Sequence, residues 1–178
     1  NWIKKTDELI QGGYGFRMEI DKAGNILVDG SFINTINFGG IQVTSPVETA
    51  YLVKYDSSGN VLWVKQGPVG SYLQTTDSDN NILYKSGGLL HKLAPDGSPV
   101  WSKNRITGLM KSDKDNNLYV TGSIKYDEPN LDFDIVVLRA GSYMSGYLAK
   151  YDKDGAIKWA RITYDAEVYD NYLNGPMT

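Results

Sequence analysis

The chain has 178 residues, 41% of them hydrophobic and 22% charged, which is enough for one domain with a hydrophobic core. It has no Cys and a single His, so we exclude disulfides, thiolate metal sites, cysteine nucleophiles and multi-histidine metal centres. A net charge of −3 and a pI of about 5.1 argue against a general nucleic-acid role, for which a basic face is typical.

Two short phrases alternate along the chain and define an internal repeat. The first begins with Asp, has Asn four residues later and continues with an apolar pair; its copies begin at Asp21, Asp77 and Asp113. The second begins with Lys and has Gly at its sixth position and Trp at its tenth. Its three copies span residues 54–63, 92–101 and 150–159, and the residues at these positions are Gly59, Gly97, Gly155, Trp63, Trp101 and Trp159. Agreement at so many fixed offsets indicates three copies of one structural unit.

Each phrase predicts a β-hairpin, because polar turn residues separate runs of Ile, Leu, Val and Tyr. In the Asp phrase, Gly24, Asn80 and Asn116 occupy one equivalent position, and Gly and Asn are the residues that tolerate a positive φ. The Asp that begins the turn can accept hydrogen bonds from backbone amides just ahead of it. One unit is therefore predicted to contain four antiparallel strands.

In chain order, the first expected element is residues 1–6, NWIKKT, an outer strand of another unit that carries Trp2 at the tryptophan position. It has neither an initiator Met nor the apolar core of a signal peptide, so we expect a mature product or a piece of a longer protein. Three four-stranded units follow, near residues 16–66, 72–104 and 109–162. Their strands are predicted near residues 16–21, 25–32, 51–56 and 61–66, then 72–77, 81–86, 89–94 and 99–104, then 109–113, 117–124, 146–152 and 156–162.

The units differ in the connection between their second and third strands. The second unit uses a tight Gly87-Gly88 turn, whereas the other two extend the hairpin, and residues 33–49 predict a strand, a Gly-Gly turn and another strand. Residues 125–145 contain a second β-rich run. Insertions at one place in each repeat emerge on one face, which is often the binding face.

Four-stranded antiparallel units in series predict an all-β fold made of β-propeller blades, about three full blades with partial strands at both ends. Strands with apolar groups on both faces are typical of a blade that is packed on both sides by its neighbours. The Trp at one equivalent position would fill the gap between adjacent blades. Because this number of blades does not complete a propeller ring, we expect residues 1–178 to be one segment of a larger propeller, or a protomer whose open edges are covered by partners.

Unit one resembles the SBBP-type bacterial β-propeller repeat. It has the Asp-x-x-Gly-Asn turn at Asp21, Phe38-Gly39-Gly40, and a Lys-Tyr-Asp-x-x-Gly-Asn-x-x-Trp ending from Lys54 to Trp63. Unit three has both ends without Phe-Gly-Gly, and unit two has Leu-Ala-Pro in place of the Tyr-Asp pair. The resemblance implies a propeller fold and a secreted or cell-surface bacterial protein.

The candidate chemical sites favour structural interpretations. Asp-x-Asp-x-Asn at Asp77 and Asp113 resembles part of a calcium loop, but the sixth-position Gly and the late carboxylate are missing, and the turn interpretation explains all three copies. His91 is predicted to be structural and not a triad base. Asp132 and Asp134 are predicted to lie on a solvated acidic face. The Gly-Gly pairs lie between β runs and are predicted turns, not phosphate loops.

We therefore predict a non-catalytic scaffold or binding module, extracellular or at the cell surface, with no cofactor, no metal and no catalytic residue. Its partner is expected to be a protein or a glycan, with no nucleic-acid binding and no membrane-embedded part. One alternative is a carbohydrate-binding propeller with aromatic residues at the blade junctions. A second is part of an enzyme propeller, since the phrase at residues 92–101 is loosely similar to the repeat of quinoprotein dehydrogenases.

Overall fold

The computed structural model describes residues 17–104, 108–125, 130–132, 137–139 and 144–166. These residues form strands and turns and no helix, so the all-β prediction is confirmed. None of them belongs to a helix long and apolar enough to cross a membrane. The predicted outer strand at residues 1–6, with Trp2, lies outside the described residues.

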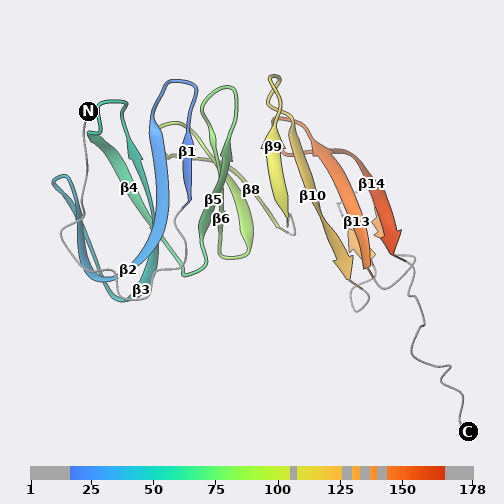
Figure 1. Ribbon diagram of the computed structural model, residues 1–178, viewed down its shortest axis with the longest axis horizontal. Coiled ribbons are helices and arrows are strands. Elements are labelled where there is room, and N and C mark those ends of the chain that lie inside the picture. The colour runs from blue at the N-terminus through green and yellow to red at the C-terminus, as the bar shows by residue number, and fades with distance from the viewer. Residues whose placement is uncertain (1–16, 105–107, 126–129, 133–136, 140–143, 167–178) are drawn as a thin grey trace, which may run out of the picture.

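Three four-stranded antiparallel sheets follow one another along the chain (Figure 1). In each sheet the strands pair in chain order, as the repeat predicts. The first sheet contains β1 (Met18–Ile20), β2 (Ile26–Phe38), β3 (Ile41–Tyr55) and β4 (Val61–Gly67). The second contains β5 (Tyr72–Thr76), β6 (Ile82–Ser86), β7 (Leu89–Leu93) and β8 (Pro99–Asn104). The third contains β9 (Leu109–Ser112), β10 (Leu118–Lys125), β13 (Met144–Tyr151) and β14 (Ile157–Ala166).

Further hairpin structure lies between the second and third strands of the first and third sheets. As predicted, residues 33–49 extend the first unit's hairpin, because β2 and β3 continue through this segment to a turn at Gly39-Gly40. A register shift between Phe32 and Asn34, with Asn34 at a φ of 68°, separates this extension from the rest of the sheet. Between β10 and β13, β11 (Asn130–Asp132) pairs with β12 (Val137–Arg139) in a separate two-stranded sheet. Asp132 therefore lies in β11, whereas Asp134 lies outside the described residues.

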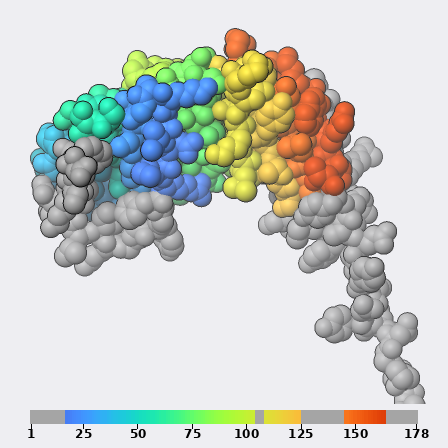
Figure 2. All heavy atoms as spheres, turned by 45° about the horizontal axis from the view of Figure 1, so that its top comes forward, coloured from blue at the N-terminus to red at the C-terminus, as the bar shows by residue number. Residues whose placement is uncertain are grey.

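The three sheets lie side by side along an arc (Figure 2). The first strands β1, β5 and β9 contact one another in series, so the sheets are joined along their first strands. Two hydrophobic clusters fill the spaces between neighbouring sheets. One contains Leu27, Leu52, Leu73, Ile82, Tyr84 and Leu93, and the other joins Leu83 and Leu90 to the third sheet. The second sheet is thus packed on both faces, which explains why its strands are apolar on both sides.

Every sheet has a β-bulge at the same repeat position. The pairing register shifts between Lys54 and Tyr55, between Lys92 and Leu93, and between Lys150 and Tyr151. A bulge bends its strand and re-aims the neighbouring side chains. The Lys beside each bulge is paired directly with the Trp of the last strand.

Candidate functional site: the junctions between sheets

The Asp turns fold around a carboxylate that organises its own loop. In the second sheet, Asp77 Oδ1 accepts hydrogen bonds from the amides of Asp79 and Asn81, both at 2.9 Å. Its Oδ2 accepts the side-chain amide of Asn81 at 3.0 Å. Asp21 and Asp113 do the same in their own turns. The predicted positive φ is confirmed, at 80° for Gly24 and 63° for both Asn80 and Asn116.

Neighbouring Asp turns are also joined to each other. The Lys22 amide donates to Asn80 Oδ1 at 2.8 Å, and the Ser78 amide donates to Asn116 Oδ1 at 2.7 Å. The Asn that permits the turn conformation therefore also links each turn to the one before it. Sequence analysis assigned these asparagines only the first role. Gly24 has no side chain with which to accept the equivalent bond.

A buried ion pair lies behind two of the Asp turns. Lys54 Nζ is 2.9 Å from Asp21 Oδ2, and Lys92 Nζ is 2.8 Å from Asp77 Oδ2. The four side chains are 7% exposed or less. Burial alone would raise the pKa of Asp21, but hydrogen bonds from Asn25 and Lys54 outweigh burial and hold that pKa below its ordinary value.

The same two lysines cross to the next sheet, together with a tryptophan. Lys54 Nζ and Trp63 Nε1 both donate to the carbonyl oxygen of Pro95, each at 3.1 Å. Lys92 Nζ and Trp101 Nε1 both donate to the carbonyl oxygen of Lys153, at 3.1 and 3.2 Å. Each acceptor lies two residues before the turn glycine of the following sheet, Gly97 or Gly155. We call this arrangement the carbonyl junction.

Each turn glycine lies directly beneath the tryptophan of the preceding sheet. A Cβ added to Gly155 would lie 3.2 Å from Trp101 Cε2, and one added to Gly97 would lie 3.4 Å from Trp63 Cε2. These glycines have φ values of 77° and 83°. The repeat residues Trp63, Trp101, Gly97 and Gly155 therefore meet in pairs across the sheet boundaries. Gly59 has a φ of 82° in the first sheet, and Trp159 lies in the third.

The glycine beneath Trp101 provides a test of this packing. Gly155→Ala is expected to lower the free energy of unfolding by about 1–3 kcal/mol, because the methyl group crowds the indole at a backbone conformation that L residues avoid. Gly88→Ala is the matched control, since Gly88 has a similar φ of 79° but has no atom within 4 Å of the added Cβ. Urea unfolding measures both variants. An equal loss in the two would mean that contact with Trp101 contributes nothing.

The acid dependence of stability tests the ion pair at Asp21. Because the pKa of Asp21 in the folded protein is below the reference value of 3.8, its contribution to stability is present above about pH 4 and is lost as the pH falls through the folded-state pKa. Asp21→Asn should therefore lower stability at neutral pH and make its decline below pH ~4 less steep. Urea unfolding between neutral and acidic pH measures this change. Asp115→Asn, at an exposed carboxylate, should change the stability at neutral pH little. If the free energy of unfolding of Asp21→Asn falls below pH ~4 as steeply as that of the original protein, Asp21 does not stabilise the fold through its ionised carboxylate.

The third sheet repeats the residues of the junction but not its bonds. Asp113, Lys150 and Trp159 hold the same repeat positions, yet no ion pair joins Lys150 to Asp113 among the described residues. Lys150 Nζ instead lies 5.1 Å from the centre of the Tyr119 ring. Hydrogen bonds from Asn117 hold the pKa of Asp113 below its ordinary value.

The carboxylates of the Asp-x-Asp-x-Asn segments are engaged within and between turns. Asp77 binds amides and Lys92, and Asp79 Oδ2 accepts the side-chain amide of Asn116 at 2.5 Å. In the described part of the chain, no group of three or more His, Cys, Asp and Glu side chains is placed to hold a metal ion. The arrangement favours the turn interpretation of these segments.

Thermal melts with and without EDTA test the calcium prediction directly. The melting temperature is expected to change by no more than about one or two degrees, because a ligand that binds only the native state would stabilise it by mass action. A melt with added calcium, compared with one with added magnesium, controls for ionic strength. A loss of several degrees in EDTA would show that the loops bind metal.

His91 joins three strands of the second sheet. Its Nδ1 lies 2.7 Å from Ser102 Oγ on β8, and its Nε2 lies 3.2 Å from the carbonyl oxygen of Ser86 on β6. In a triad Nε2 faces the serine and Nδ1 faces a carboxylate, whereas in His91 Nδ1 faces the serine and Nε2 faces a backbone carbonyl. This geometry fits the predicted structural role.

A buried carboxylate that sequence analysis missed joins the first and second sheets. Asp29, on β2, is 2% exposed and accepts the Arg17 amide at 2.7 Å and the Leu73 amide at 2.6 Å. Burial raises its pKa, although both amides act in the opposite direction. The Arg17 guanidinium carbon lies 4.0 Å from the centre of the Tyr72 ring, and Arg17 Nη1 donates to the Leu73 carbonyl at 3.2 Å.

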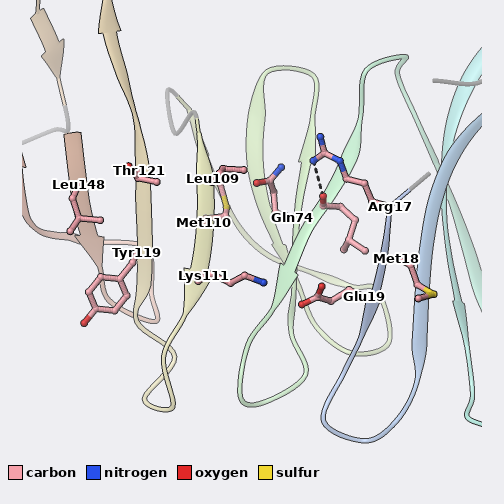
Figure 3. A pocket seen from close by; sticks show the side chains of 11 residues that line it. Arg17, Met18, Glu19, Gln74, Leu109, Met110, Lys111, Tyr119, Thr121 and Leu148 are labelled. Atoms are coloured by element: carbon pink, nitrogen blue, oxygen red, sulfur yellow. Dashed lines mark hydrogen bonds between the residues drawn. The ribbon is translucent and has the colours of Figure 1, made fainter. Parts of the chain in front are cut away.

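A hollow of about 620 Å³ runs past the first strands of all three sheets (Figure 3). It is lined by Arg17, just before β1, by Glu19 on β1, by Gln74 on β5 and by Lys111 on β9. It continues onto the third sheet, where its lining includes Tyr119, Thr121 and Leu148. Positively charged, negatively charged and apolar side chains thus line the same hollow.

Comparison with known proteins defines no family for this chain. No family model matches it, and no curated protein matches it. One similar solved structure is a protein of unknown function from Bacteroides caccae, with a TM-score of 0.38 and 13% sequence identity over 83% of this chain and 68% of that chain. The class of protein that the described residues establish is therefore an all-β protein with three serially joined, four-stranded antiparallel sheets.

Proposed function

We propose that this chain is a non-catalytic β-propeller scaffold or binding module of the SBBP repeat type, belonging to a bacterial secreted or cell-surface protein. Each four-stranded sheet is one blade. The observation that supports the proposal is the carbonyl junction, which has the same chemistry between the first and second sheets and between the second and third. Such repeated joints make a rigid curved support out of small units that cannot bury both their faces alone.

The binding face of this module is the side that carries the long hairpins. The extension of β2 and β3 exposes Ile33, Ile41 and Val47, which are 41%, 38% and 64% exposed. Isolated surface apolar residues are common, but these three lie on one projecting hairpin. A protein or glycan partner is the occupant that the proposal assigns to this side.

The alternative functions find less support at the junctions. A carbohydrate-binding propeller with junction aromatics would need accessible ring faces there, and Trp63 and Trp101 lie against the glycines of the next sheet. The phrase at residues 92–101, which suggested a quinoprotein-like enzyme, supplies the acceptor Pro95 and the donor Trp101 of two junctions. We therefore favour the scaffold function over the carbohydrate-binding and enzyme alternatives.

Native-state hydrogen exchange combined with small-angle X-ray scattering tests the scaffold. If the sheets act as one rigid support, the slowest amides of all three should exchange with a single common free energy, and the scattering should match the arc. Separate opening energies for the three sheets, or a flexible scattering profile, would contradict the proposal.

A further inference from the structure

The three sheets present the same row of side chains on one face, which we call the donor face. In the first sheet the row is Leu27, Lys54 and Trp63, which are paired across β2, β3 and β4. In the second sheet the corresponding row is Leu83, Lys92 and Trp101. In the third it is Tyr119, Lys150 and Trp159. Beside these rows lie Leu52, Leu90 and Leu148 at one shared repeat position.

Two of these donor faces are covered by the next sheet. Leu27, Leu52 and Leu90 are 0% exposed and Leu83 is 2% exposed. The covering sheet supplies a backbone carbonyl to the Lys and Trp donors, and a glycine beneath the indole. A donor face is therefore complementary to a turn of another unit in which a Gly follows two residues after the accepting carbonyl, and this complementarity is seen twice.

The donor face of the third sheet is uncovered among the described residues. Tyr119 and Leu148, whose counterparts are buried, are half-buried and border the 620 Å³ hollow on neighbouring strands β10 and β13 (Figure 3). No described carbonyl accepts a hydrogen bond from Trp159 Nε1 or Lys150 Nζ. The indole of Trp159 instead meets the edge of Tyr119, with ring centres 6.2 Å apart.

The Asp turns provide independent evidence that no described unit covers the third sheet. The amides of Lys22 and Ser78 each donate to an Asn side chain of the following turn. Lys114 holds the equivalent position in the third turn, and its amide has no such acceptor in the described ranges. The Trp159 indole and the Lys114 amide therefore both have no described acceptor of the kind that their counterparts find in the following sheet.

We infer that the donor face of the third sheet docks a further four-stranded unit of this repeat, supplied in tandem. A turn carbonyl of that unit accepts hydrogen bonds from Trp159 Nε1 and Lys150 Nζ, and the glycine two residues later lies beneath the indole. An Asn or Asp at the fourth position of its Asp turn accepts the Lys114 amide. Lys150 leaves the Tyr119 ring and pairs with Asp113, as Lys92 pairs with Asp77. This inference rests on the proposed propeller function.

The test replaces residues 167–178 with one further unit. A second copy of residues 105–166 is appended directly after Ala166, so that its connection matches the one between the second and third sheets. Hydrogen exchange of the indole N–H groups is followed by NMR in the original and extended chains. In the extended chain, the Trp159 indole N–H is expected to slow into the range of Trp63 and Trp101, and the melting temperature is expected to rise.

The matched control carries Gly155→Val in the appended copy alone. This change should remove protection from Trp159 while leaving Trp101 protected by the original Gly155. If Trp159 exchanges equally fast with and without the added unit, while Trp63 and Trp101 stay protected, the inference is wrong and the scaffold proposal stands. Fast exchange at all three indoles would instead overturn the carbonyl junction, and the proposed function with it.

Sedimentation of the original chain distinguishes a different occupant. If Trp159 becomes protected only as the original chain self-associates, then a second copy occupies the donor face, and the assignment of a tandem unit is overturned. A monomer in which the Trp159 indole N–H exchanges fast supports the assignment when the extended chain shows protection.

Discussion

Replacing Asp77 with Ala is expected to lower the free energy of unfolding by about 3–5 kcal/mol, because it leaves the ammonium of Lys92 buried without its carboxylate. The same change removes the acceptor for three hydrogen bonds that shape the turn. Lys92 also carries the hydrogen bond to the third sheet, so the loss extends to the junction. Urea unfolding followed by circular dichroism measures the effect.

The repeat supplies a matched control for this variant. Asp113→Ala removes the same turn hydrogen bonds, but Lys150 is not paired with Asp113. It should therefore cost clearly less than Asp77→Ala. A double variant, Asp77→Ala with Lys92→Met, should recover part of the loss, because the unpaired charge is then absent. Equal losses at Asp77 and Asp113 would mean that the ion pair adds nothing to the turn.

Trp101→Ala is expected to cost about 3 kcal/mol, because it empties the space over Gly155 and removes the hydrogen bond to the Lys153 carbonyl. Trp101→Phe should cost less, since it keeps most of the apolar contact and loses a hydrogen bond worth about 1 kcal/mol. Thermal and urea unfolding of the two variants separate packing from hydrogen bonding.

Trp159→Ala is the control for Trp101→Ala within the same repeat. Trp159 holds the same position in its sheet, where its ring meets the edge of Tyr119 and lies near the Arg161 guanidinium. No described glycine from another sheet lies beneath it. Its loss should therefore be markedly smaller than that at Trp101. A loss at Trp159 as large as at Trp101 would show that tryptophan contributes mainly within its own sheet.

Local features of the fold were predictable because they depend on residues close in sequence. The Asp turns could be read from Asp77 and Asn80, since a carboxylate that accepts nearby amides and a residue that tolerates positive φ act within one loop. The Gly39-Gly40 turn was found for the same reason. The extension of the hairpin through residues 33–49 was predicted, but the register shift after Phe32 was not, because nothing local fixes the register there.

The junction chemistry was not predictable, because its acceptor is a backbone carbonyl that no side-chain pattern marks. Sequence analysis placed Trp63 and Trp101 between units but did not assign a role to Lys54 or Lys92. A signal was present, because a Lys recurs in an apolar strand nine residues before each Trp of the repeat. Asp29 gave no signal, since a polar residue in a strand normally faces solvent, and its burial depends on amides from β5 and from Arg17.

The choice of a backbone carbonyl as the joint has an evolutionary consequence. Pro95 and Lys153 perform the same task although one is a rigid imino acid and the other a long cation. Mutation at such a position changes the exposed side chain but leaves the backbone carbonyl that accepts the hydrogen bonds of the neighbouring sheet. Units can therefore diverge, duplicate or be exchanged within a gene while neighbouring units can still form the carbonyl junction. Selection for new external surfaces and selection for assembly act on different atoms of the same residue.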